Sequence, residues 1–126
     1  MIQRVFFPQL PSLNEIVDMA KVRDRDGGKW SKYASVKKKV EKDLVYLIKA
    51  AKLVPVKRAK FTCTWRERCE RKDPDNLAAG VKYIMDSLVL AKILEDDGWA
   101  QVQSIHHYFV VSPQREAGVT VEIESV

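Results

Sequence analysis

The chain has 126 residues, of which 46% are hydrophobic and 31% are charged, and its net charge is +5. This length suits one compact domain, and this composition excludes an intrinsically disordered chain. No apolar run approaches the roughly 20 residues of a transmembrane helix, and the first ten residues lack a signal-peptide pattern, so we expect a cytoplasmic protein outside the membrane. The positive charge favours a polyanionic partner, either nucleic acid or an anionic membrane surface.

The first half of the chain predicts a strand, a helix and a second strand. Residues 2–7 form a short strand that ends at Pro8. Residues 8–32 hold most of the loop signals, including Gly27-Gly28, with a short helical segment around residues 13–20. An amphipathic helix is expected over residues 33–52, because apolar residues recur at helical spacing (Val36, Val40, Leu44, Leu47 and Ala51). Residues 57–66 alternate as a half-buried strand, with one set facing inward (Ala59, Phe61, Cys63 and Trp65).

The second half predicts a helix followed by two strands. Asp73 suits the N-cap and Pro74 the first position of a helix over residues 74–92, with an apolar stripe facing the core (Leu77, Val81, Ile84 and Leu88). An acidic turn at residues 95–98 follows, then strands over 101–111 and 119–124, separated by a loop. The order strand, helix, strand, helix, strand, strand predicts a single α+β domain over residues 1–126, with two main helices on a mixed β-sheet.

Basic side chains are concentrated in the segment from Lys21 to Lys49. This segment holds ten Lys or Arg and four Asp or Glu, a local balance of +6 (ten minus four). Lys37, Lys38 and Lys39 span most of a helix circumference, so they do not all face one partner. A solvated helix face and a set of phosphate contacts are both consistent with this pattern.

Cysteine, histidine and tryptophan give weaker signals. Cys63 and Cys69 lack the spacing of a metal site or a disulfide framework, which predicts reduced thiols. His106 and His107 are neighbours on a predicted strand, so one is expected near the core and the other exposed. Trp99 directly follows the acidic turn and is a candidate contact to DNA.

Carboxylates and a lysine recur along the predicted helix over residues 74–92 and in the turn after it. On one continuous helix, Lys82 and Asp86 lie within about 20° of the direction of Asp75, opposite the apolar stripe. Carboxylate oxygens are the ligands that Mg²⁺ prefers, and paired Mg²⁺ ions can activate water for phosphodiester hydrolysis. A neighbouring lysine adds positive charge where the transition state gains negative charge.

The same residues also fit a purely structural interpretation. An Asp N-cap, a Pro and an acid in the first turn make an ordinary helix start. Lys82 and Asp86, four residues apart, make an ordinary surface ion pair. Geometry alone leaves both interpretations open.

Three segments of the chain together resemble the RusA family of Holliday-junction resolvases. They are Arg-Lys-Asp-Pro-Asp-Asn-Leu at 71–77, Lys-Tyr-Ile-Met-Asp-Ser-Leu at 82–88, and Asp-Asp-Gly-Trp at 96–99 with Val102 beyond it. Leu-Pro-Ser-Leu-Asn-Glu at 10–15 also resembles the family's loop after its first strand. The resemblance covers most of the chain and is concentrated in residues 71–99.

The resemblance implies a homodimeric endonuclease that cuts four-way DNA junctions with Mg²⁺, or alternatively with Mn²⁺. Asp73 and Asp75 match the paired metal-binding aspartates of the family. Asp97 matches the third, with Asp96 as the alternative ligand. Lys82, the lysine of the Lys-x-x-x-Asp motif, matches the family's essential lysine when the alignment is counted back from Asp86. When the alignment is counted forward from Asp73 against shorter family members, the lysine position falls at Ala79 instead.

Basic residues just before the paired aspartates are the expected phosphate contacts, because DNA must approach the metal ions there (Arg66, Arg68, Arg71 and Lys72). Asn14 is added to this set by the resemblance alone. A module that binds branched DNA without cutting it is the alternative function. It accounts for the basic residues but not for acids gathered near DNA. A structural or interaction protein with an acidic surface is a third, weaker interpretation.

Overall fold

The computed structural model describes residues 1–22 and 30–126. The predicted break at Gly27-Gly28, and Arg23, Arg25 and Lys29 of the basic segment, lie outside the described residues. The elements, in order, are β1 (Ile2–Pro8), α1 (Leu13–Ala20), α2 (Lys32–Ala50), β2 (Ala59–Glu67), α3 (Pro74–Ala78), α4 (Val81–Leu90), β3 (Val102–Val111) and β4 (Gly118–Ser125). The predicted α+β class and the approximate order of the elements are confirmed.

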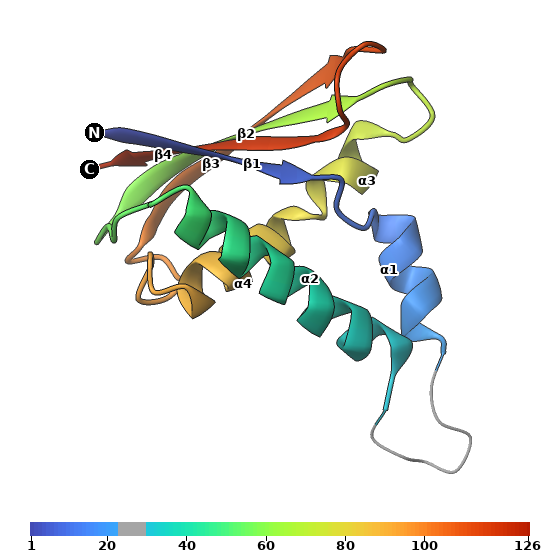
Figure 1. The fold of residues 1–126 in the computed structure, drawn as a ribbon, viewed down its shortest axis with the longest axis horizontal. Helices are drawn as coiled ribbons and strands as arrows, with labels where there is room; N and C mark the ends of the chain where they lie inside the picture. Colours follow the sequence, from blue (N-terminus) through green and yellow to red (C-terminus); the bar gives the residue numbers. More distant parts are fainter. Residues whose placement is uncertain (23–29) are drawn as a thin grey trace.

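The four strands form one mixed sheet in the order β1-β4-β2-β3. β4 pairs antiparallel with both β1 and β2, whereas β2 and β3 are parallel. Parallel neighbours need a crossover connection, and the segment containing α3 and α4 supplies it. The long helices α2 and α4 lie on one side of the sheet, and none of the described helices covers its opposite face (Figure 1).

The core lies between the sheet and these helices. The inward-facing side chains of β2 are buried as predicted, from Ala59 to Trp65. Val119, Val121 and Ile123 of β4 complete the apolar floor. Burial raises the pKa of the Cys63 thiol to about 12, and both Cys63 and the exposed Cys69 are free thiols, as predicted.

The core face of α2 differs from the predicted stripe. Leu44 and Ile48 are its buried residues, whereas Ala51 is exposed. The helix ends at Ala50, and the chain turns away at Lys52 with a φ of 55°. Ala51 therefore lies beyond the last helical turn, and Ile48 takes the inward position.

The predicted helix over residues 74–92 is two helices, which corrects the continuous stripe of Asp75, Lys82 and Asp86. α3 ends at Ala78 and α4 begins at Val81. Gly80, between them, is buried, and a Cβ there would lie 3.1 Å from the Trp65 ring and 3.3 Å from Leu10 Cβ. Glycine both weakens the helix and allows this close approach. Only Lys82 and Asp86 remain on one helical face.

The two histidines of β3 differ as expected. His106 is exposed, whereas His107 is half-buried and its Nδ1 accepts a hydrogen bond of 2.9 Å from Trp65 Nε1. Burial, with a smaller contribution from the charge of His106, lowers the pKa of His107. Across residues 1–22 and 30–126, every helix is too short or too polar to cross a membrane.

Candidate metal and nucleic-acid site

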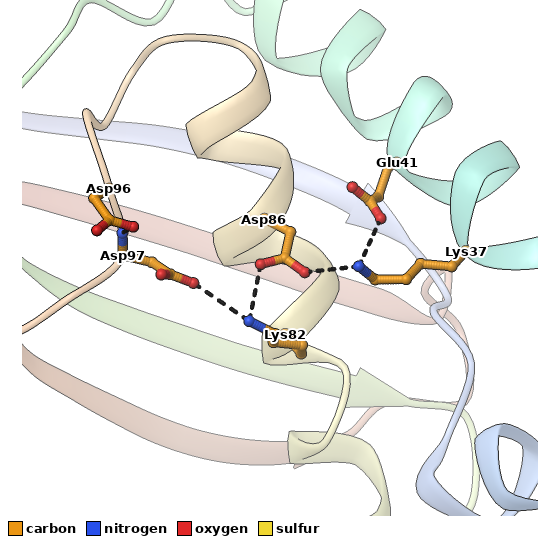
Figure 2. Close-up of polar contacts among 6 residues, drawn as sticks. All are labelled: Lys37, Glu41, Lys82, Asp86, Asp96 and Asp97. Carbon is orange, nitrogen blue, oxygen red and sulfur yellow. Dashed lines mark hydrogen bonds and ion pairs between the residues drawn. The ribbon is translucent and has the colours of Figure 1, made fainter. Parts of the chain in front are cut away.

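Lys82 meets the acidic turn after α4. Its Nζ lies 3.0 Å from Asp86 Oδ1 and 3.5 Å from Asp97 Oδ2 (Figure 2). Hydrogen bonding to Asp86 is the largest cause of a raised Lys82 pKa, and the charge of Asp97 adds to it. Lys82 therefore stays protonated at neutral pH. The fold thus brings together two of the predicted site residues that are fifteen positions apart.

Asp86 extends this contact into α2. Its other oxygen, Oδ2, lies 3.0 Å from Lys37 Nζ, and Lys37 also lies 3.1 Å from Glu41 Oε1 (Figure 2). Burial alone would raise the pKa of Asp86, but hydrogen bonds from Lys82 and Lys37 outweigh it and lower that pKa. The result is a polar chain across two helices, running from Glu41 to Asp97.

Lys37 and Glu41 were absent from the predicted site, and Asp86 was singled out on the helical stripe and in the Lys-x-x-x-Asp motif but not assigned a site role. Two pairs at i,i+4 spacing, Lys37–Glu41 and Lys82–Asp86, were the available signal. The Lys37–Asp86 contact between helices has no sequence signal, because it depends on how α2 packs against α4. Lys37 is thus paired with carboxylates rather than being a freely solvated charge.

The two acids of the closing turn point in different directions. Asp97 is directed at Lys82, and its side chain is 31% exposed. Asp96 is exposed, and its Oδ1 accepts a hydrogen bond of 2.8 Å from the backbone N–H of Asp97 (Figure 2). Of the two alternatives, Asp97 is therefore the acid that faces the lysine.

Asp73 and Asp75 begin α3. Asp73 is the N-cap residue, with an extended backbone (φ −71°, ψ 149°), but its carboxylate makes no capping hydrogen bond. Asp75 is exposed, and its Oδ1 accepts a hydrogen bond of 2.9 Å from the N–H of Asn76. Within the described part of the chain, neither carboxylate has an ion-pair partner. The side chain of Asp73 is therefore not used as an ordinary helix cap.

The paired aspartates and Asp97 border different hollows in the surface. Asp73 lines a cavity of about 370 Å³ that includes Phe109 of β3. Asp97 lines another of about 380 Å³ that includes Ile105. No three His, Cys, Asp or Glu side chains among residues 1–22 and 30–126 form a group that could hold a metal ion.

The predicted phosphate contacts are divided between several locations. Lys72 Nζ lies 3.1 Å from the carboxylate of Glu15, the residue after Asn14 on α1. Arg68 Nε donates to the Pro113 carbonyl oxygen over 3.0 Å. Asn14 and Arg71 are exposed.

Arg66 is half-buried near the end of β2. It alternates with the inward-facing Trp65, so its side chain points to the face of the sheet without helices. Its buried Nε has no hydrogen-bond partner among the described residues. Of the predicted contacts, Lys72 is paired with Glu15 of α1, whereas Arg66 points to the other face of the sheet.

Replacing Asp86 with asparagine is expected to cost about 1 kcal/mol of stability at pH 7, because two lysines lose their shared carboxylate. The pKa of Asp86 is lowered from 3.8 in the folded protein. The carboxylate therefore stabilises the fold fully above about 3.8, and this contribution is lost as the pH falls through the lowered folded value. Urea unfolding of both proteins at pH 7 and at acid pH measures this difference.

Asp43→Asn is the control for that comparison, because Asp43 is an exposed acid on α2. It should change stability little at either pH. An Asp86→Asn cost that is the same at pH 7 and below the folded pKa would show that the ion pairs are not its cause.

No protein-family model matches the chain, and a search of curated proteins finds no similar sequence.

Proposed function

We propose that this chain is a divalent-cation-dependent endonuclease of the RusA type, which cuts four-way DNA junctions as a homodimer in the cytoplasm. The contact between Lys82 and Asp97 carries this proposal. It joins the Lys-x-x-x-Asp motif to the closing acidic turn, two parts of the RusA-like pattern that are separate in sequence. A surface ion pair between Lys82 and Asp86 alone would not require the acidic turn to face the lysine.

Asp73, Asp75 and Asp97 are the residues proposed to hold the cation. Their oxygens suit Mg²⁺ or Mn²⁺, and the first two lack cationic partners in the described residues. They do not form a ready three-ligand group in the single chain, so the proposal requires them to gather when the cation and DNA bind. A bound cation would supply an activated water and neutralise charge on the phosphate.

Lys82 is proposed to place a fixed positive charge beside the phosphate that is cut. It is protonated at neutral pH, and Asp86 orients it toward the acidic turn. A charge that is already in place stabilises the transition state without the cost of reorganisation. This assigns Asp86 a positioning role and Lys82 an electrostatic one.

Trp99 and Arg71 are proposed to contact the DNA. The Trp99 side chain is 96% exposed and follows the acidic turn, whereas Arg71 is an exposed cation just before Asp73. Exposed aromatic rings can stack on unpaired bases, and arginine binds phosphate oxygens. A junction offers both unstacked bases and closely spaced phosphates to such a surface.

A module that binds branched DNA without cutting it is the second candidate. Basic residues before Asp73, such as the exposed Arg71, support it equally well. It leaves unexplained why acids should border a DNA-binding face, where they repel phosphate unless a cation is present. Dependence on a divalent cation therefore separates the two candidates.

Cleavage of a labelled immobile four-way junction tests the proposal directly. The protein is incubated with Mg²⁺, with Mn²⁺ or with EDTA, beside a linear duplex of the same sequence. We expect paired nicks in the junction that need a divalent cation, and little cutting of the duplex. Tight junction binding without cutting under either metal would overturn the nuclease proposal and favour the binding module.

A further inference from the structure

β3 is an edge strand with little of the usual protection of such an edge: its register against β2 shifts once, between Val102 and Ser104. One side pairs with β2, and the other has no strand partner in the described part of the chain. Its ten residues, Val102–Val111, include no Lys, Arg, Asp, Glu or Pro. Proteins usually protect edge strands with charges, proline or bulges, because an open edge pairs readily with another strand.

The opposite edge of the sheet has such protection. β1 is shorter, ends in Pro8 and carries Arg4, whose Nε lies 3.2 Å from Glu122 of β4. The two edges of one sheet therefore differ. β1 is built to remain unpaired, whereas β3 is left able to accept a partner.

Half of the residues of β3 are large apolar or aromatic residues that are exposed, and they lie on both faces of the strand. Tyr108 is 59% exposed, and the other exposed large side chains are between 37% and 48% exposed (Ile105, Phe109, Val110 and Val111). Apolar side chains gathered along an open edge strand are typical of a surface that is covered in an assembled protein.

We propose that β3 pairs antiparallel with β3 of a second copy of this chain, which makes one continuous eight-stranded sheet. A copy of the same strand matches the edge in length, in its lack of charge and in its apolar side chains. A two-fold pairing also uses the open edge of both copies and so stops at a dimer, whereas a single added peptide strand would leave its own outer edge open. These observations favour a second copy of this chain as the partner of β3.

Symmetry limits the register of this pairing. The two-fold axis must be perpendicular to the sheet, so residues on one face meet only residues on the same face. Because faces alternate along a strand, the axis lies midway between one residue and the copy of the same residue, rather than level with the gap between two residues. For the greatest overlap of Val102–Val111, that residue is His106 or His107. One of these histidines therefore lies opposite its own copy, with Cβ atoms about 5 Å apart.

This inference deepens the homodimer of the proposed function by giving it a surface. It rests on the proposed function only where it identifies this dimer with the proposed homodimeric nuclease, because the reasons for the pairing come from β3 alone. The tests therefore measure association without DNA or metal. A protein that dimerises through β3 but does not cut DNA would refute the nuclease and leave this interface in place.

Sedimentation velocity over a range of concentrations is the first test. Tyr108→Lys places a charge on the open edge, and Tyr46→Lys makes the same change at an exposed tyrosine on α2 (72% exposed). We expect the wild type and Tyr46→Lys to dimerise alike, and Tyr108→Lys to dissociate at least tenfold more readily while keeping its circular dichroism spectrum. A wild type that stays monomeric, or a Tyr108→Lys protein that dimerises as tightly, would overturn the proposal.

Cysteine crosslinking tests the register and does not depend on weakening the dimer. His106→Cys and His107→Cys are made separately in a Cys69→Ser background, which removes the exposed natural thiol. We expect one of the two variants to form a disulfide-linked dimer on mild oxidation, because only the residue on the axis lies opposite itself within disulfide reach. Failure of both to crosslink would show that β3 does not pair with itself.

Discussion

The Asp75→Asn protein is expected to bind a four-way junction as tightly as the wild type and to cut it at least about a thousandfold more slowly. A ligand to a catalytic cation contributes several kcal/mol to the transition state, and each 1.36 kcal/mol is a factor of ten in rate. Asparagine keeps the side-chain oxygen that accepts the hydrogen bond from the N–H of Asn76, so the start of α3 should be preserved. Single-turnover cleavage and gel-shift binding of the same junction measure the two quantities.

Asp43→Asn is the matched control, because it removes the same charge from an exposed acid on α2. Any gain in binding that comes only from the extra positive charge should appear in both variants. Cleavage by Asp75→Asn at the wild-type rate would remove Asp75 from the mechanism. Equal loss of binding and cleavage would instead indicate a role in holding DNA.

Gly118→Ala is expected to destabilise the fold by about 3 kcal/mol, a large effect for the addition of one methyl group. A Cβ at Gly118 would collide with the Phe7 carbonyl oxygen and lie 2.6 Å from the Phe6 ring. Gly118 lies opposite Pro8 at the end of the β1–β4 ladder, so this contact cannot be relieved without separating the two strands. The shift of the urea unfolding midpoint measures the cost.

Gly98→Ala makes the same substitution where there is room for it. Its Cβ would lie 3.6 Å from Gln101 Oε1 and 3.8 Å from Asp96 Oδ2, which are ordinary contacts with flexible side chains. The unfolding midpoint of this variant should lie close to that of the wild type. If the two alanine variants shift the midpoint equally, the close approach of β1 to Gly118 is not what makes the first one costly.

The strands could be predicted well because their pattern is local. Alternation of apolar and polar residues identified the inward faces of β2 and β4, where Phe61 and Val121 are fully buried. The break between α3 and α4 could not be predicted in this way, since the apolar spacing continues across it. It depends on the contact of Gly80 with Trp65, a residue fifteen positions earlier on a different element.

The candidate site was predicted in part. The Lys82–Asp97 contact is consistent with the sequence motif, although nothing in the local sequence fixes the distance between its two parts. Lys37 was missed because its contact with Asp86 arises from the packing of two helices. That Asp73, Asp75 and Asp97 gather around a cation stays a prediction. The sequence of α3 and of the break after it, residues 74–80, does not by itself determine where Asp73 and Asp75 lie relative to Asp97.

The ion pairs of Lys37, Lys72 and Lys82 should weaken the dependence of the protein's DNA affinity on salt concentration. When a lysine binds phosphate, the condensed counterions that it displaces give a slope of about −0.9 per contact in a plot of log affinity against log salt concentration. Lys37, Lys72 and Lys82 are already neutralised by carboxylates of the same chain. To bind DNA, each of these lysines must exchange its carboxylate partner for a phosphate. The slope should therefore be shallower than a count of the 22 Lys and Arg residues of the chain would predict.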